Sequence, residues 1–377
     1  AIDSTIDKDV TASDSNLASA STWRYFNSPE DGARVTKGWF KVVAPDDDND
    51  NTFMDYGTGF AKDDAGDETE RWYYADANGI LYEGEIKSIK GKYYGFWPDD
   101  GDKGGAMLNG LCVLQMDGSK IEKVIADDID SNDLDDILDG NYENQDSWSD
   151  VYLYYFGNDL DGDGAMKTGN VTVNLDGNSY NFLFKKTGNP AGGRGQGVTG
   201  IEDKKYIYSY GCKIKASSDD KYKLVKITGT NGNENDAVDI NSKNVKVEKM
   251  STPVWSNDTN YKNSDEETVR YHYNEGSDDI DFTDNVYYLV NTSGNIQKNK
   301  LNGLKDGNEC YYYVDKEMKV ILYTDNKTLK SMKGSSYNVS KNDADTFIKE
   351  YASKINDGGN GSDSNTTEDE STTTAAN

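Results

Sequence analysis

The stretch that decides the fold reads WYYADANGILYEGEIKSIKGKYYGF and covers residues 72–96. An aromatic triplet at 72–74 is followed by a Gly-x-x-x-x-Gly segment at 79–84 and by a second aromatic strand at 91–96. Aromatic residues favour strands, whereas Gly, Asn and Asp favour the turns between them. The first glycine supplies the positive φ that a tight turn needs. The stretch therefore predicts short β-hairpins that follow one another along the chain.

The same compound order recurs, in degenerate form, in three other places. An opening unit covers 23–40, a second full unit covers 154–182, and a third covers 287–313, where Asn299 stands at the position expected for the second glycine. Related glycine segments are GAMLNG at 105–110, GAMKTG at 164–169 and GQGVTG at 195–200. A single hairpin is only marginally stable, so repeated hairpins are expected to stack on one another as a solenoid.

These observations predict a mainly β fold, an elongated solenoid-like stack of degenerate β-hairpin repeats with long acidic loops and a short C-terminal helix. The helix is expected over 340–355, where apolar residues recur at helical spacing, and a second short helix is possible over 131–138. The segments expected to be strands are KYYGFW, VYLYYF, VTVNL, YNFLF, KYIYSY, KYKLVKI, NVKVEKM, VYYLV, CYYYV and KVILY.

The chain is expected to divide at changes of composition. Residues 1–20 read as a linker or terminal segment, and residues 358–377 lack aromatic and large aliphatic side chains, which predicts a disordered tail. Between them we expect three repeat blocks, at 21–145, 146–250 and 251–330, and a C-terminal helical segment at 331–357.

Composition excludes several classes of partner. Hydrophobic residues make up 34% of the chain and the formal net charge is −28, which argues against nucleic acid and against anionic membrane surfaces. No apolar run reaches the length of a membrane span. The three cysteines, Cys112, Cys212 and Cys310, lie too far apart for a disulfide framework and are expected to be buried hydrophobes. The first residue is Ala1, which fits a processed, secreted chain.

The repeats resemble the cell-wall-binding repeats of Gram-positive surface proteins, the superfamily of choline-binding and glucan-binding repeats. The likeness is carried by GWF at 38–40, WYY at 72–74, GKYYGF at 91–96, GAMLNG and GAMKTG. It covers residues 23–115 and 151–215, and more weakly 286–323. The resemblance implies an extracellular or cell-surface protein that binds cell-wall polymer or polysaccharide. Acidic insertions separate Trp39 from Trp72, so we expect a saccharide or wall-polymer site rather than a choline cage.

Aromatic residues are the candidate ligand-binding groups, because ring faces stack on sugar rings as readily as on quaternary ammonium groups. For any one tyrosine, packing in the hairpin core is the competing interpretation. The candidates for glycan or wall binding are Trp39, Trp72, Tyr73, Tyr94, Trp97, Trp148, Tyr154 and Trp255.

A calcium loop is the only cofactor site that the sequence suggests. Asp159, Asp161 and Asp163, with Gly164, have the D-x-D-x-D-G spacing of such a loop. The twelfth position is Asn170 instead of Glu, and strands flank the segment, so an EF-hand is excluded. An acidic hairpin turn is the alternative interpretation.

Enzyme chemistry has little support in the sequence. His272 is the only histidine, and no paired cysteines exist, which argues against a catalytic triad and against a histidine zinc site. The sequence therefore favours a non-catalytic binding module. Two alternatives stay open: a structural or adhesive spacer whose acidic loops are stiffened by calcium, and the targeting region of a larger cell-wall or glycan hydrolase.

Overall fold

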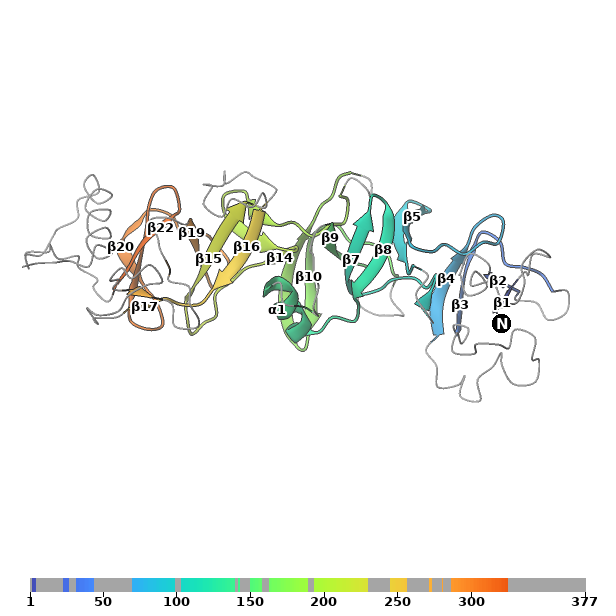
Figure 1. The fold of residues 1–377 in the computed structure, drawn as a ribbon, viewed down its shortest axis with the longest axis horizontal. Coiled ribbons are helices and arrows are strands. Elements are labelled where there is room, and N and C mark those ends of the chain that lie inside the picture. Colours follow the sequence, from blue (N-terminus) through green and yellow to red (C-terminus); the bar gives the residue numbers. More distant parts are fainter. Residues whose placement is uncertain are drawn as a thin grey trace, which may run out of the picture. The chain divides into compact units, whose positions relative to one another are not determined.

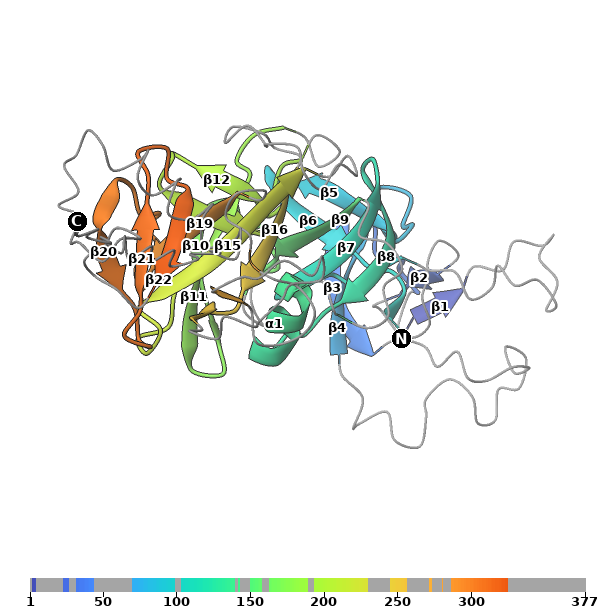
Figure 2. The same ribbon diagram turned by 60° about the vertical axis from the view of Figure 1, so that its left-hand side comes forward.

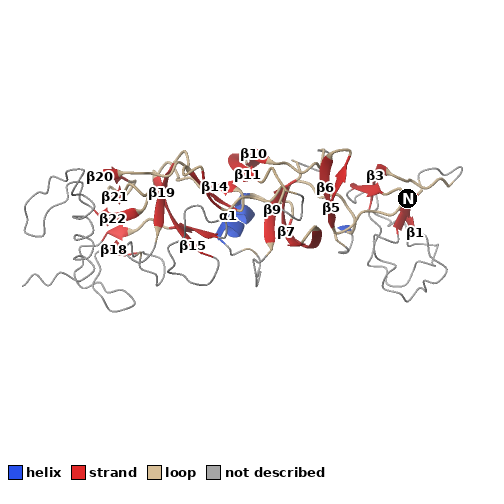
Figure 3. Cartoon of the chain, turned by 90° about the horizontal axis from the view of Figure 1, so that it is seen from above, coloured by secondary structure: helices blue, strands red, loops and turns tan. Residues whose placement is uncertain are grey.

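The chain is built mainly from antiparallel β-strands, as the computed structural model shows (Figure 3). Among the described residues, one segment forms an α-helix. The structure describes residues 2–4, 23–26, 32–43, 70–98, 103–139, 142, 150–157, 163–188, 193–229, 245–255, 271–272, 280 and 286–324. The mainly β prediction is thus confirmed. The helix expected over 340–355 and the tail at 358–377 lie outside the described residues.

The chain divides into two compact units. The first comprises Ala1–Ile214 with Val238–Glu248, and the second comprises Lys215–Ala237 with Lys249–Asn377. The boundary after Ile214 falls inside the block expected at 146–250.

The first unit begins with two small antiparallel pairs. Strand β1 (Ile2–Ser4) pairs with β2 (Trp23–Tyr25). Strand β3 (Gly38–Val43) pairs with β4 (Glu70–Ala75) along its whole length, so the two ends of a long insertion meet at one end of this hairpin (Figure 1). Strands β2, β3 and β4 carry aromatic residues, which suit a pleated and half-buried surface.

Two five-stranded antiparallel sheets follow in the first unit. One sheet has the order β6-β5-β8-β7-β9, and the other has the order β10-β11-β14-β13-β12. The strands of the first sheet are β5 (Glu85–Ile89), β6 (Lys92–Phe96), β7 (Leu111–Asp117), β8 (Lys120–Ala126) and β9 (Val151–Tyr155). Those of the second are β10 (Gly169–Leu175), β11 (Asn178–Phe184), β12 (Gly200–Glu202), β13 (Tyr206–Ser209) and β14 (Cys212–Lys213).

In the second unit, neighbouring strands also run antiparallel. Strand β15 (Tyr222–Gly229) pairs with β19 (Tyr287–Asn291), and β17 (Val254–Trp255) pairs with β18 (Tyr271–His272). A three-stranded sheet has the order β20-β21-β22, with bounds Lys300–Lys305, Tyr311–Val314 and Val320–Thr324. Strand β16 covers Val245–Met250, of which Val245–Glu248 belong to the first unit. Every segment predicted as a strand from its sequence contains a strand.

Helix α1 (Ser131–Asp139) confirms the short helix predicted over 131–138 (Figure 2). Its N-terminus is capped by Asp130, whose Oδ1 accepts hydrogen bonds from the backbone N–H groups of Asn132 and Asp133 at 2.7 and 2.9 Å. Leu134, Ile137 and Leu138 are buried and pack in a core cluster with residues of β7, β9, β10 and β11. The capped helix therefore covers apolar strand side chains.

The three cysteines are free thiols. Cys112 and Cys212 are buried, and Cys310 is half-buried. Burial raises the pKa of the Cys112 thiol well above its ordinary value, so this thiol stays protonated and packs as a small apolar group.

Among the described residues, no helix is long and apolar enough to cross a bilayer.

Candidate functional site

The turns that follow strands β4, β19, β20 and β21 share one hydrogen-bonding pattern. At Asp76, the side-chain Oδ1 accepts hydrogen bonds from the backbone N–H groups of Asn78 and Ile80, both at 2.8 Å. The same contacts recur at Asn291, Asp306 and Asp315. In each, the side-chain Oδ1 accepts hydrogen bonds from the backbone N–H groups of the residues two and four positions later. An Asp or Asn side chain that bonds its own backbone in this way fixes a tight turn. These four strands are thereby folded back at a set point.

The glycine spacing has the conformational cause that the sequence predicted. Gly79, the first glycine of GILYEG, has φ +76°, and the second, Gly84, has φ +59°. Asn299, at the second-glycine position of the third unit, has φ +53°. Asparagine is one of the few residues that adopt this left-handed conformation readily. The degenerate unit therefore keeps the backbone of the complete ones.

Pairing of β3 with β4 brings together tryptophans that are distant in the sequence. Trp39 lies directly opposite Tyr74, and Lys41 lies opposite Trp72. Paired residues project from the same face, and so do residues two apart on one strand. Trp39 and Trp72 therefore share a face of this hairpin. The acidic insertion between them does not keep them apart, because it leaves the hairpin at its other end.

The next hairpin adds rings to the same face. Tyr94 of β6 packs edge-on against Trp39 with ring centroids 4.8 Å apart, and Phe96 lies 5.9 Å from Trp39. Tyr82, which follows the turn at Asp76, stacks on Tyr74 at 5.4 Å. We call the resulting group the Trp39 cluster; its members are Trp39, Trp72, Tyr74, Tyr82, Ile89, Tyr94, Phe96 and Met107.

The Trp39 cluster has a closed base and a partly open upper layer. Phe96 is fully buried, and Tyr74, Ile89 and Met107 are also buried. Trp39, Trp72, Tyr82 and Tyr94 are only half-buried and pack against that base. Rings that are supported from beneath and partly exposed above can stack on a ligand without reorganising. These four side chains are the candidate binding groups.

Charged side chains surround the rings in pairs. Lys87 lies with its Nζ 5.4 Å from the ring centroid of Tyr82 and 2.9 Å from Glu85 Oε2. Lys41 lies 4.0 Å from Glu70. Burial raises the pKa of the Tyr82 and Tyr94 hydroxyls, so both phenols are neutral near pH 7.

The equivalent place on the following hairpin is filled by apolar side chains. Ile86 pairs with Gly95 as Trp39 pairs with Tyr74, and the N–H of Leu108 donates to the Gly95 carbonyl as that of Tyr82 donates to the Tyr74 carbonyl. A Cβ atom at Gly95 would lie 2.8 Å from Leu108 Cδ1 and 2.9 Å from a Phe156 ring carbon. The second position is therefore packed shut.

Three predicted binding residues lie in the core instead. Tyr73, Trp97 and Tyr154 are 1%, 7% and 0% exposed, in the cluster that also holds Phe40 and Leu108. Trp97 is further covered by Lys103, whose Nζ lies 4.6 Å from the ring. We do not include these three in the binding face, because core side chains cover their rings.

The remaining two predicted aromatic residues contribute no described side chain. Trp148 lies outside the described residues, and Trp255 is placed only as a member of β17. Tyr82, by contrast, belongs to the site although the sequence analysis did not select it. Its position inside GILYEG was the available signal, because that segment must fold back beside the aromatic strand.

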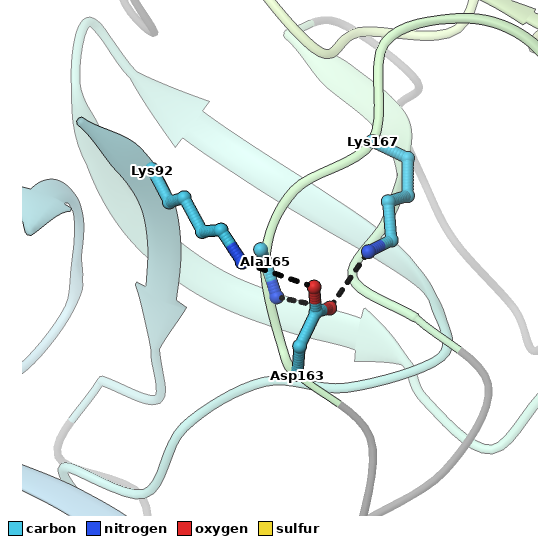
Figure 4. Close-up of polar contacts among 4 residues, drawn as sticks. All are labelled: Lys92, Asp163, Ala165 and Lys167. Atoms are coloured by element: carbon cyan, nitrogen blue, oxygen red, sulfur yellow. Dashed lines mark hydrogen bonds and ion pairs between the residues drawn. The ribbon is translucent and has the colours of Figure 1, made fainter. Parts of the chain in front are cut away.

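Asp163, predicted as a calcium ligand, is held by two lysines (Figure 4). Its Oδ1 accepts a hydrogen bond from Lys167 Nζ at 2.7 Å and from the N–H of Ala165 at 3.2 Å, and its Oδ2 lies 3.4 Å from Lys92 Nζ. The hydrogen bond from Lys167 is the main cause that lowers the pKa of Asp163. Asp159 and Asp161 lie outside the described residues, so calcium binding stays a prediction.

No family model and no curated protein matches the chain. Solved structures do match at low identity. Choline binding protein F from Streptococcus pneumoniae is 17% identical, over 84% of this chain and 75% of that chain, with a TM-score of 0.20. The modular autolysin LytC from Streptococcus pneumoniae, in complex with a synthetic peptidoglycan ligand, is 11% identical over 84% of this chain, with a TM-score of 0.25. The modular Cpl-1 endolysin, complexed with a peptidoglycan analogue, is 18% identical over 44% of this chain, with a TM-score of 0.18.

The match spans only 52% of the autolysin and 30% of the endolysin. Because the TM-scores are low, we base the functional proposal on the side chains of this chain.

Proposed function

We propose that the chain is a non-catalytic, extracellular binding module that attaches to cell-wall polymer or polysaccharide through the Trp39 cluster. One observation carries the proposal: four half-buried aromatic rings from two successive hairpins lie over a closed apolar base. Most aromatic rings of a hairpin repeat are buried in its core. A group of four rings that stays partly exposed on one face is typical of a ligand site.

The chemistry of the cluster suits a sugar ring. The apolar C–H face of a pyranose stacks on indole and phenol faces, and its hydroxyls need donors and acceptors at the edge of the aromatic surface. Glu85 and Lys87 supply an acceptor and a donor beside Tyr82. Mixed apolar and polar surroundings of this kind are characteristic of small-molecule sites.

The other parts of the proposal follow from the repeats. One turn pattern recurs after β4, β19, β20 and β21, and the β3–β4 hairpin packs on the β5–β6 hairpin; both features support a solenoid-like stack. Among the described residues, no group of three or more His, Cys, Asp or Glu side chains is arranged to hold a metal ion. The non-catalytic role is tested directly by turnover of wall and glucan substrates.

The experiment is a retention assay on purified Gram-positive cell walls and on insoluble glucan. We expect the full chain to be retained and Trp39→Ala to bind at least about tenfold more weakly, as for a central aromatic contact. Trp39→Tyr should keep much of the affinity because it keeps a ring.

Tyr206→Ala is the matched control. Tyr206 is also half-buried, but it lies on β13 in the other five-stranded sheet. We expect this variant to bind as the wild type does. If the wild type is retained on no polymer, or if both alanine variants lose binding equally, the proposal is wrong.

A further inference from the structure

Lys87 is placed to act on any ligand of the Trp39 cluster. It pairs with Tyr94 in the register of β5 and β6, so both side chains leave the same face of the hairpin. Its Nζ lies 5.4 Å from the Tyr82 ring centroid and 2.9 Å from Glu85 Oε2. The hydrogen bond to Glu85 is the main cause that raises the pKa of Lys87. The ammonium group is therefore charged at neutral pH.

This ammonium group already occupies the place over the Tyr82 ring that a cationic ligand would take. An aromatic face attracts a cation within about 6 Å of the ring centroid, and Lys87 lies within that range of Tyr82. A second cation on the cluster would meet the like charge of Lys87. The carboxylate of Glu85 is paired with the same lysine.

The remaining carboxylate near Tyr82 is also engaged. Asp76 acts electrostatically on the Tyr82 hydroxyl, but its Oδ1 accepts the two backbone hydrogen bonds that hold the turn. These hydrogen bonds do not cancel the charge of Asp76, which is the same in every Lys87 variant. Lys87 therefore decides whether the Glu85 carboxylate is also available to a cation. Without Lys87, two carboxylates and several ring faces would remain.

We infer that Lys87 determines specificity: it closes the Trp39 cluster to quaternary and other cationic groups and leaves it open to uncharged sugar rings. The inference rests on the proposed function and narrows its ligand class. A neutral pyranose meets no repulsion from Lys87. Its hydroxyls can accept a hydrogen bond from the lysine ammonium and donate one to the Glu85 carboxylate. Both charged side chains are accessible, with 42% and 30% of their surfaces exposed.

The test uses tetramethylammonium chloride as a soluble cationic probe and the full-length chain. A soluble probe is necessary because a chain of net charge −28 would bind any cationic matrix by ion exchange. Sodium chloride at the same ionic strength is the reference, and tryptophan fluorescence or calorimetry is the readout. Three variants are compared: Lys87→Met, the double variant Glu85→Gln/Lys87→Met, and Trp39→Ala/Lys87→Met.

We expect the wild type to show no saturable binding of tetramethylammonium below about 100 mM, the weak range for an isolated cation–π contact in water. Lys87→Met should bind it at least about tenfold more tightly, because the charge that repels the probe is gone and Glu85 is freed. The double variant should lose much of this gain, and Trp39→Ala/Lys87→Met should lose it entirely. Thermal unfolding of Lys87→Met should match the wild type, since Lys87 is half-exposed.

Two results would overturn the inference. One is wild-type binding of tetramethylammonium as tight as that of Lys87→Met, and the other is the absence of any gain in a folded Lys87→Met. Neither depends on wall retention. Failure of the wild type to bind any polymer would instead overturn the proposed function, while the comparison of the variants would still report on Lys87.

Discussion

Trp39 and Tyr94 pack edge-on with ring centroids 4.8 Å apart, although they belong to strands of two different sheets. This contact joins the β3–β4 hairpin to the β5–β6 hairpin. Ring pairs in such an arrangement attract each other through their quadrupoles, beyond the area that they bury. The same two residues therefore contribute to hairpin packing and to the candidate binding face.

A double-mutant cycle on Trp39→Ala and Tyr94→Ala should reveal this contact as coupling. We expect a coupling free energy of about 0.5–1.5 kcal/mol, measured by urea unfolding of the full chain. Trp39→Ala combined with Tyr206→Ala is the control pair and should be additive within about 0.5 kcal/mol. Equal coupling in both pairs would mean that the Trp39–Tyr94 contact is not specific.

Gly95→Ala should destabilise the first unit by about 1–3 kcal/mol, because the added methyl group would overlap Leu108 and Phe156. Gly38→Ala is the matched control in strand β3, where the new Cβ would have its nearest neighbour at 3.4 Å. Its effect should stay within about 0.5 kcal/mol. Denaturant unfolding of both variants measures the difference. Equal losses of unfolding free energy would contradict the conclusion that Leu108 and Phe156 fill the space beside Gly95.

Asn299 should tolerate glycine but not a β-branched residue. Its φ of +53° lies in the left-handed region, so Asn299→Val should cost about 1–2 kcal/mol of unfolding free energy. Asn299→Gly should change it by only a few tenths of a kcal/mol, since glycine adopts this conformation freely. A valine variant as stable as the wild type would show that the turn does not need the positive φ.

Asp163 should make the stability of the first unit depend on pH in the acid range. The pKa of its carboxyl is lowered in the folded chain, chiefly by the hydrogen bond from Lys167, so folding favours the ionised form. The stabilising contribution is present above the unfolded pKa of about 3.9 and is lost as the pH falls through the lower folded pKa.

We therefore expect Asp163→Asn to lower the melting temperature slightly at pH 6 and to have less effect near pH 2. The difference should shrink in high salt, since the side chain is 47% exposed and salt screens exposed ion pairs. Melting curves from pH 2 to pH 7 provide the measurement. A difference that grows toward low pH would refute the assigned sign.

The sequence predicted the strands well because their aromatic and β-branched residues sit between clear turn residues. Helix α1 was also predictable, since Asp130 precedes apolar residues at helical spacing. The pairing of β3 with β4 was not, because a long insertion hides the relation between Trp39 and Trp72. Burial of Trp97 was missed for a related reason: acidic residues follow it closely in the sequence, whereas its core cluster includes Phe40 and Tyr154, which are distant along the chain.

The β3–β4 hairpin carries its insertion at one end and the Trp39–Tyr74 ring pair near the other. Val43 and Glu70, which lead into and out of the insertion, face each other at one end, whereas Trp39 and Tyr74 face each other near the other end. The length and composition of residues 44–69 can therefore vary in evolution, or be exchanged in the laboratory for an unrelated segment, while the pairing of Trp39 with Tyr74 is kept. The hairpin is in this sense a natural grafting point, because the Trp39–Tyr74 pair lies near the end opposite to the graft.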